Sequence, residues 1–532
     1  MMCRMKVYSW GVFLFLLLPL GLNASGSTGW INVVDRGADK RGEVEVGAII
    51  AASIEEAHER GGGTVYFPAG EYLTGPIHLK SNVTLHLDAG ALVKFSTDFD
   101  LYLPFVQQRW EGTVMMNFSP LIYAHGQENI AITGRGKFDG QGREWWRWHY
   151  NNKSDPDVIP RHKYFDLWEE LNPDVVTEDY YWNTMKWRFF RPPMVQFFDC
   201  SNILVEGVTL VNSPFWTLNP AFSDNITIHD VTIINPPSPN TDGINPTSCR
   251  NVRISNSYIS VGDDCITIKS GRDIDGRKWA TPTENITITN CTMLSGHGGV
   301  VIGSEVSGDI RKITISNCVF DGTRRGIRLK SARGRGGIVE DVRISNIVMR
   351  NIQEQALVFN LFYDPSAEPE PITERTPIFR NIHVSNLTAV DVKNACTFYG
   401  ISEMPIENLT FNNINIEAET GFVIHTGKNI ELHNVEVSVT EGPSFLVEHS
   451  SDLIFSNIKA RNSLKNQPVV VFNQVSNAFL TNIFPLAATD VFLEVQGEES
   501  AAIFLQNSNF SNVEEVVRRA PGVKRSAVKV RK

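Results

Sequence analysis

The sequence is poor in cysteine, in long hydrophobic runs and in basic residues. Seven cysteines in 532 residues are too sparse for a fold held together by disulfides. After the first 24 residues, no stretch approaches the roughly 20 apolar residues that a membrane-spanning helix requires, so we expect no membrane span. The formal net charge is −10. An acidic chain lacks the basic field that phosphate groups require, so we expect no nucleic-acid partner.

Residues 1–24 resemble a secretory signal peptide. Arg4 and Lys6 precede an apolar run, and the small residue Ala24 follows it, where a signal peptidase could cut. Cleavage removes both basic residues and no acid, which changes the formal charge from −10 to −12. We therefore predict an exported protein, either secreted or periplasmic.

A short phrase of Asn, aliphatic, polar and aliphatic residues recurs along the chain. Examples are "SNVTLHL", "SNILVEG", "DNITIHD", "RNVRISN", "ENITITN" and "RNIHVSN". Each phrase predicts a short strand with one buried face. No amphipathic helix separates the phrases, which argues against a doubly wound sheet or an α/β barrel. The period predicts an all-β, single-domain, right-handed parallel β-helix, that is, a solenoid of short strands.

The boundaries of this solenoid follow from its flanking segments. The segment "EVEVGAIIAASIEEAHERGGG" predicts an N-terminal helix that caps the open end of the core. We place the catalytic β-helix domain at 25–515 and a flexible basic tail at 516–532. A long insert at about 144–191 contains many tryptophans. Long loops on a rigid scaffold often carry specificity, and this one could close one end of a cleft, although most of its aromatic residues are expected simply to pack against the solenoid.

The repeat also explains residues that suggest other roles. We interpret several Asn residues in Asn-X-Thr triplets as turn residues of the repeat and not as glycosylation sites, namely Asn82, Asn225, Asn285, Asn386 and Asn408. The cysteines in "ITNC" and "ISNC" fall at equivalent positions of successive coils, which predicts a buried stack. A disulfide between Cys265 and Cys291 is the alternative.

Polar clusters recur at intervals of about one repeat in the middle of the chain. They contribute three carboxylates, an imidazole and two cations to one wall of the solenoid: Asp242, Asp263, Asp264, His297, Arg328 and Lys330. Crowded carboxylates favour keeping one of them protonated, as glycoside hydrolysis requires. Arg328 and Lys330 lie two residues apart on a strand, so they share a face and could bind an acidic sugar.

These motifs, in this order, resemble those of glycoside hydrolase family 28, the polygalacturonases. The resemblance includes "INVVDRGA", "GGGTVYFPAGEYLTG" and "SPFWTLNP" and spans nearly the whole mature chain. It implies an inverting hydrolase of α-1,4-galacturonan in pectin. It makes Asp263 the general acid, Asp242 and Asp264 the pair that holds water, and His297 the active-site histidine. Substrate-binding roles fall to Asn240, Arg328, Lys330, Trp216 and Tyr363, although Tyr363 could equally be a packed loop residue.

Two geometric expectations follow. An inverting mechanism places the carboxyl of Asp263 roughly 6.5 to 9.5 Å from the base carboxylates. Because regular alternation from Ile266 and Ile268 would bury Asp264 in the core, we also expect a turn or kink at that residue. Leu329 stands where the family has Ile, which is harmless if the side chain points into the core.

Several readings of function remain open. We predict an exo-acting polygalacturonase that works as a monomer on pectic polysaccharide or oligogalacturonides, without a metal or another cofactor. An endo-polygalacturonase and a rhamnogalacturonan hydrolase are alternatives in the same family. A pectate lyase would need a carboxylate calcium site, which the sequence does not suggest. A noncatalytic carbohydrate-binding β-helix is the alternative from another class.

Overall fold

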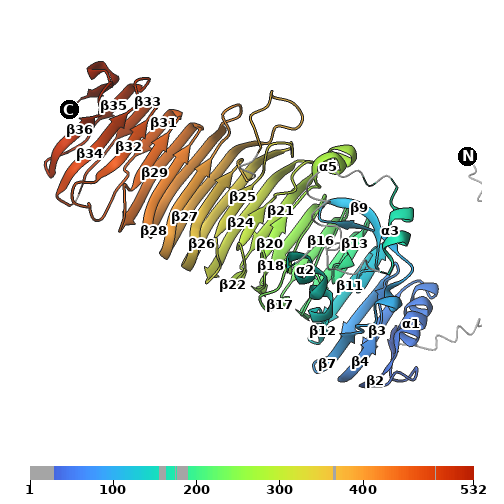
Figure 1. Ribbon diagram of the computed structural model, residues 1–532. Coiled ribbons are helices and arrows are strands. Elements are labelled where there is room, and N and C mark those ends of the chain that lie inside the picture. The colour runs from blue at the N-terminus through green and yellow to red at the C-terminus, as the bar shows by residue number, and fades with distance from the viewer. Residues whose placement is uncertain are drawn as a thin grey trace, which may run out of the picture.

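The computed structural model describes residues 29–154, 163–173, 175, 190–363, 367–485 and 487–531. The predicted signal peptide therefore lies outside the described residues. The chain forms an elongated right-handed parallel β-helix, with the N-terminal coils at one end and the C-terminal coils at the other (Figure 1). The predicted fold class is confirmed.

Successive coils pair in parallel with equivalent residues opposite one another. Ile203 of β14 (Ser201–Glu206) lies opposite Ile226 of β16 (Asp224–His229), and Ile226 lies opposite Val252 of β18 (Arg250–Ser255). All three side chains are buried. The alternating phrase therefore places its aliphatic residues in the core, as expected for strands with one buried face.

The strands form three columns that run along the solenoid. One column contains β1 (Trp30–Asn32), β3 (Gly63–Phe67), β6 (Val83–Leu87), β11 (Glu128–Gly134), β14, β16, β18, β21 (Thr283–Thr289), β24 (Ile310–Asp321), β31 (Ser451–Ser456), β33 (Ser476–Thr481), β35 (Ala501–Gln506) and β37 (Val528–Val530). A second contains β2 (Arg41–Glu45), β4 (Gly70–Thr74), β7 (Ala91–Phe95), β12 (Lys137–Asp139), β15 (Thr209–Val211), β17 (Thr232–Ile234), β19 (Tyr258–Ser260) and β22 (Thr292–Ser295).

The third column carries the acidic motifs and is called here the site sheet. It contains β5 (Ile77–His78), β10 (Ile122–His125), β13 (Val195–Phe198), β20 (Ile266–Ile268), β23 (Val300–Ile302), β25 (Ile327–Lys330), β30 (Phe445–Glu448), β32 (Pro468–Asn473), β34 (Thr489–Gln496) and β36 (Val513–Arg519). The long strands β26 (Ile338–Asn360), β27 (Ile378–Tyr399) and β28 (Ile406–His425) end in this sheet, and β29 (Gly427–Val439) belongs to the other columns.

The recurring asparagines lie just before or within the strands: Asn82 precedes β6, whereas Asn225 is the second residue of β16 and Asn386 lies within β27. The five asparagines interpreted as turn residues all have positive φ, a conformation that Asn tolerates better than most residues. Their side chains form a ladder: Asn129 Nδ2 donates to Asn82 Oδ1 at 2.9 Å, and Asn225 Nδ2 donates to Asn202 Oδ1 at 2.6 Å. The positive φ angles agree with the predicted turn role.

The six cysteines of the described chain are all buried and free. The structure therefore confirms the predicted buried positions and contradicts the alternative disulfide between Cys265 and Cys291. Their thiols contribute to packing, and the core of apolar side chains supplies the cohesion of the solenoid.

The two ends of the solenoid are closed differently. Helix α1 (Gly47–Glu59) packs Ile50 and Ile54 against the N-terminal coils, which confirms the predicted cap. The segment 516–532, predicted as a flexible tail, differs from expectation. It contributes the end of β36, the turn η3 (Arg525–Ala527) and β37, which pairs with β35. Its short apolar residues complete the last coil because the exposed edge of β35 offers unpaired backbone groups.

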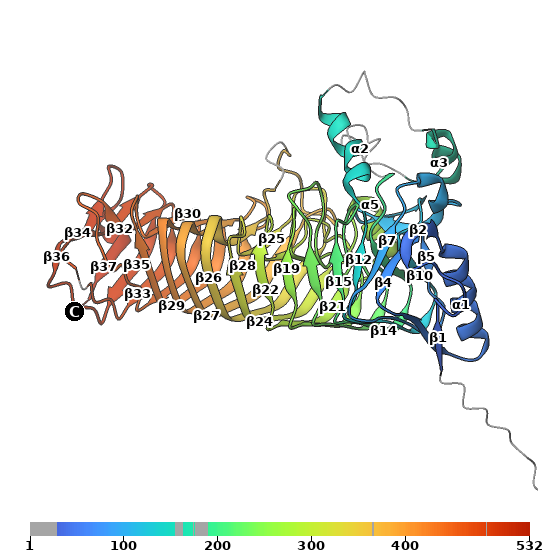
Figure 2. The ribbon, with the colours of Figure 1, turned by 90° about the horizontal axis from the view of Figure 1, so that it is seen from below.

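The remaining helices lie near the site sheet. They are α2 (Arg143–Ser154), α3 (Phe165–Leu171), α5 (Asp273–Trp279) and the short turn η1 (Phe99–Tyr102). Figure 2 shows α2 and α3 standing out from the body near its N-terminal end. No helix of the described chain is long and apolar enough to cross a membrane.

Candidate active site

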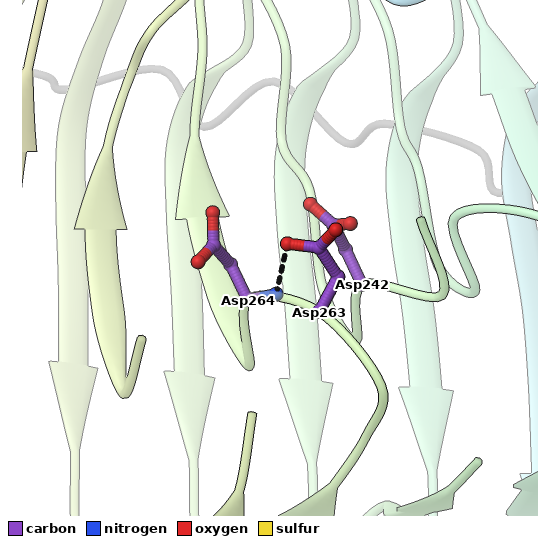
Figure 3. Close-up of side chains that lie close together, drawn as sticks. All are labelled: Asp242, Asp263 and Asp264. Atoms are coloured by element: carbon purple, nitrogen blue, oxygen red, sulfur yellow. Dashed lines mark hydrogen bonds between the residues drawn. The ribbon is translucent and has the colours of Figure 1, made fainter. Parts of the chain in front are cut away.

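The doubled aspartate lies in a bend between β19 and β20. The backbone bends at Gly262 and Asp263, and the amide of Asp264 donates to Asp263 Oδ1 at 2.9 Å (Figure 3). The predicted bend is therefore confirmed. It keeps Asp264 out of the apolar core, although its side chain is almost fully covered.

The register brings the third aspartate beside this pair. Ile244 lies opposite Ile266 on the next coil, so Asp242 and Asp264 occupy equivalent positions two residues earlier. One oxygen from each of the three carboxylates lies within 4.8 Å of the others (Figure 3). This is closer than the 6.5 to 9.5 Å that we predicted, because adjacent coils are only about 4.8 Å apart.

Asp242 is buried among polar groups. Its Oδ2 accepts hydrogen bonds from Asn245 Nδ2 at 2.8 Å and Thr267 Oγ1 at 3.3 Å. Burial, followed by the charge of Asp263, raises the pKa of Asp242 well above its usual value. Of Asp242 and Asp263, Asp242 is therefore the one that more readily keeps a proton.

Asp263 is the most accessible carboxylate, with a side chain 19% exposed. Burial alone would raise its pKa, but the hydrogen bond and charge of His297 and the charges of Lys330 and Lys269 outweigh burial and lower it. His297 Nδ1 lies 3.1 Å from Asp263 Oδ1. That hydrogen bond raises the pKa of His297 and favours the imidazolium form.

The basic motif lies on β25, two coils beyond β20. Lys330 Nζ contacts Asp264 Oδ2 at 2.9 Å, and both side chains are nearly covered. Arg328 is 9% exposed, and its Nε has no hydrogen-bond partner among the described residues. A buried guanidinium with an unused donor suits an anionic ligand. Leu329 is fully buried, as expected for a residue that points into the core.

Tyr363 covers this basic pair from the loop after β26. The ring centroid lies 5.3 Å from Arg328 Cζ and 5.6 Å from Lys330 Nζ, and the residue is 42% exposed. The geometry therefore places the phenol beside the predicted sugar-binding cations and leaves part of it open to a ligand.

Trp216 does not have the surface expected of a sugar-stacking residue. It is only 3% exposed, its ring stacks on Phe215 with centroids 5.1 Å apart, and Lys269 Nζ lies 4.7 Å above it. The ring therefore supports Lys269, because the rest of its surface is covered by packed side chains. Asn240 is also engaged, since its Oδ1 accepts from Arg191 Nη2 at 2.9 Å.

Lys269 and Glu305 are site residues that the sequence analysis missed. Lys269 Nζ donates to Glu305 Oε2 at 2.6 Å, and the charges of Glu305 and Asp242 more than offset burial and raise the pKa of Lys269. The signal was the alternation in "ITIKS", which puts Thr267 and Lys269 on the face opposite the buried isoleucines. Glu305, in a loop, had no comparable signal.

A hairpin covers the site sheet on the N-terminal side of the aspartates. The hairpin consists of β8 (Val106–Trp110) and β9 (Thr113–Asn117). Arg109 N donates to Gln196 Oε1 at 3.1 Å, and Gln196 Nε2 donates back to Arg109 O at 2.9 Å. The Trp110 ring stacks on Phe215 at 4.9 Å, one coil before Asp242. The outward face of the site sheet is therefore covered there.

The tip of the hairpin reaches the floor of the site. Arg272 N donates to Gly112 O at 3.2 Å, and a Cβ added to Gly112 would lie 2.9 Å from Arg272 Cβ and 3.2 Å from Glu305 Cγ. A residue larger than glycine does not fit this contact. The hairpin thus ends directly beside Glu305, the partner of Lys269.

The described part of the insert at 144–191 braces this hairpin. Met116 N donates to Asn172 Oδ1 at 2.7 Å, and Trp145 packs against Phe99 and Tyr102 with centroids 4.3 and 5.2 Å apart. The expected packing role is confirmed for Trp145 and for Trp168, which is also buried. Trp182 and Trp187 lie outside the described residues.

Comparisons with known proteins place the chain in a family. Residues 188–421 match the family model described as Glycosyl hydrolases family 28, and residues 30–112 match one described as Rhamnogalacturonase A/epimerase, pectate lyase-like. A probable polygalacturonase of Vitis vinifera is 30% identical over 364 residues, covering 67% of each chain. This chain belongs to glycoside hydrolase family 28.

Solved structures and other relatives agree with this assignment. An exopolygalacturonase from Thermotoga maritima is similar with a TM-score of 0.67 and 34% identity, covering 76% of this chain and 91% of that one. An endo-polygalacturonase of Pectobacterium carotovorum is 30% identical over 295 residues, covering 55% of this chain and 65% of the relative. The chain is a glycoside hydrolase, as predicted, and its relatives include both exo- and endo-acting enzymes.

Proposed function

We propose that this family 28 hydrolase removes galacturonic acid units from one end of α-1,4-linked galacturonan. The observation that carries the proposal is the arrangement along the site sheet: the three aspartates lie together, the cations Arg328 and Lys330 lie two coils beyond β20, and the β8–β9 hairpin covers the sheet one coil before Asp242. A chain cannot continue past the hairpin. Only a terminal sugar therefore reaches the carboxylates.

The roles of the carboxylates follow from their exposure. Asp263, the accessible one, protonates the glycosidic oxygen as that bond breaks. Asp242 and Asp264 hold a water, which adds to the anomeric carbon and loses its proton to this pair. Arg328 and Lys330 bind the carboxylate of the sugar, and His297 orients Asp263 through the hydrogen bond between His297 Nδ1 and Asp263 Oδ1.

Substrate binding favours the transfer of a proton from Asp242 to Asp263. Lys330 is among the groups that lower the pKa of Asp263 in the free protein. A galacturonate carboxylate at Lys330 and Arg328 offsets that positive charge, and a nearby negative charge disfavours ionisation. The pKa of Asp263 therefore rises on binding, and a proton on Asp242 becomes available to Asp263.

The test is a digestion of polygalacturonate followed by product length. We expect monomeric galacturonate as the dominant early product and a slow fall in viscosity. A rapid fall in viscosity with mixed oligomers would identify an endo-acting enzyme. An unsaturated, ultraviolet-absorbing product would identify a lyase, and the absence of any product a binding protein.

The stereochemistry is a separate prediction. Inversion at an α-linkage releases the β-anomer first, which proton NMR detects before mutarotation. The oxygen spacing within 4.8 Å is nearer to the roughly 5 to 5.5 Å of retaining enzymes than to the inverting range. We nevertheless expect the β-anomer, because the family resemblance implies inversion and the Asp242 and Asp264 pair can hold water on one side of the sugar. An initial α-anomer would contradict this mechanism.

We also propose that the enzyme is exported. The proposal rests on the signal-like composition of residues 1–24. Fractionation of cells that express the full chain, with N-terminal sequencing of the exported product, tests it. A product that starts near Ser25 is the expected result.

A further inference from the structure

The strand pairing of the site sheet continues beyond the catalytic coils. Lys330 lies opposite Asn360, Asn360 opposite Tyr399, and Tyr399 opposite His425 on successive coils. Because the hairpin covers the site sheet on the N-terminal side of the aspartates, a polymer whose terminal sugar is bound must leave over these C-terminal coils. Each coil advances about 4.8 Å, which is close to the length of one sugar unit.

One edge of this surface carries a row of rings. Tyr399 is 37% exposed, and its ring centroid lies 5.9 Å from that of His425. The ring of His425 in turn lies 5.1 Å from that of His449, which is exposed. Burial, and then His449, lowers the pKa of His425, so its imidazole is neutral near pH 7. Flat, partly exposed rings suit the apolar face of a pyranose.

The middle of the site sheet and the edge opposite the rings also suit a sugar. Val358, Thr397 and Val423 lie opposite one another along the middle of the sheet; Val358 is buried, and Thr397 and Val423 are partly exposed. On the opposite edge, Asn394 lies opposite Thr420, whose Oγ1 donates to Asn394 Oδ1 at 2.6 Å. The surface therefore offers an apolar strip between aromatic rings and amide or hydroxyl groups, which match the hydrogen-bonding edge of a sugar.

The charges near this surface do not favour carboxylates. The row opposite Lys330 continues with the neutral residues Asn360 and Tyr399 and reaches the acid Glu448 opposite His425. The loop that follows β26 carries the exposed acids Glu368 and Glu374. The nearby cation Arg333 is paired with Glu403, and Lys393 stands beyond the edge formed by Asn394. A polyanion therefore gains little electrostatic binding energy on this surface, and an uncharged sugar meets no electrostatic penalty.

We infer that the surface formed by Thr397, Tyr399, Val423, His425 and His449 binds an uncharged stretch of the same pectic polymer, namely methyl-esterified galacturonate units. The inference rests on the proposed polymer-trimming function. His425 and His449 lie beyond residues 188–421, so this surface extends past the part of the chain that matches the family model.

Binding in an inactive background tests the site independently of turnover. In Asp263→Asn protein, we expect the added change Tyr399→Ala to weaken the affinity for partly methyl-esterified galacturonan about three- to tenfold. Affinity for fully de-esterified polymer should change less than twofold. Phe479→Ala is the matched control, because Phe479 is also an exposed aromatic residue, at 38%, but lies on β33 in another column.

Kinetics of the active enzyme provide a second readout. With Tyr399→Ala, KM for the esterified polymer should rise by the same factor at unchanged kcat, and kcat/KM for a trigalacturonate should stay constant. Equal loss on the trimer, equal loss on de-esterified polymer, or equal binding of a neutral galactan would each overturn the inference. A wild-type protein that binds esterified polymer through Tyr399 but yields no monomer would instead refute only the proposed activity.

Discussion

Asp263→Asn lowers kcat on polygalacturonate by at least about a hundredfold, which is the usual contribution of a general acid. Asn has nearly the same shape, and its amide can still contact His297, but it has no acidic proton to give to the leaving oxygen. We expect KM to change little because the cations that bind the sugar carboxylate are intact. Initial-rate measurements of released reducing ends provide the test.

The matched control for this change is Asp230→Asn. Asp230 is exposed and has φ of 53°, a conformation that Asn adopts equally well, so its replacement should leave kcat unchanged. An aryl galacturonide with an activated leaving group separates the roles further. Its cleavage needs little help from an acid, so Asp263→Asn should slow it far less than it slows the polymer. Equal slowing of both substrates would assign Asp263 a different role.

Arg328→Gln lowers kcat/KM on polygalacturonate by about 30- to 1000-fold, which corresponds to roughly 2 to 4 kcal/mol for truncating one partner of a buried charge pair. The buried guanidinium has an unused Nε donor and lies beneath Tyr363. Without it, the sugar carboxylate enters a covered site with only Lys330, which is already paired with Asp264. Arg328→Lys should restore little of the loss, since an ammonium group cannot form the planar two-point contact.

Arg350→Gln is the control for charge alone, because Arg350 is exposed in the middle of β26, opposite Asp321 and outside the site sheet. It should alter kcat/KM less than twofold. A methyl-ester substrate gives the diagnostic comparison: its terminal unit has no carboxylate, so Arg328→Gln should not reduce its slow hydrolysis. A similar loss on charged and uncharged substrates would indicate that Arg328 maintains the structure of the site and does not read the carboxylate.

Neither replacement is expected to change the stability of the fold much. Asp263 is partly exposed and coupled to His297, and its replacement removes a charge from a crowded acidic cluster. Arg328 is buried with few polar contacts, so Gln at this position leaves no broken hydrogen bond behind. Thermal unfolding of both variants should therefore lie within a few degrees of the wild type, which makes activity losses interpretable as local effects.

Local repetition made most of the architecture predictable. The alternation of apolar and polar residues identifies the side chains that point into the core, and the recurring asparagine marks the turn. The coil and the order of its strands therefore follow from the sequence alone. The same repeat places Asp242, Asp263, His297 and Arg328 at similar positions of successive coils. Their proximity was inferable because coils stack in register, with each repeat contacting only its neighbours.

Contacts between distant segments were not predictable in this way. The hairpin at 106–117 covers the site sheet through Gln196 and Phe215, which lie far from it in sequence. Its residues do not follow the repeat, so the sequence gives no sign that this segment packs over the site sheet. The burial of Trp216 and the engagement of Asn240 by Arg191 have the same origin, because exposure depends on what packs over a residue as well as on its own position.

The sequence by itself determined the coil, its core and the set of acidic and basic residues that face one side, because each of these depends on local alternation and on a regular rise per coil. Only the tertiary structure decided the spacing of the carboxylates, the opposite pKa shifts of Asp242 and Asp263, and the covering of the site sheet by the β8–β9 hairpin. These depend on side-chain conformation, on burial by segments remote in sequence, and on the sum of surrounding charges. None of them is encoded in a repeat of a few residues.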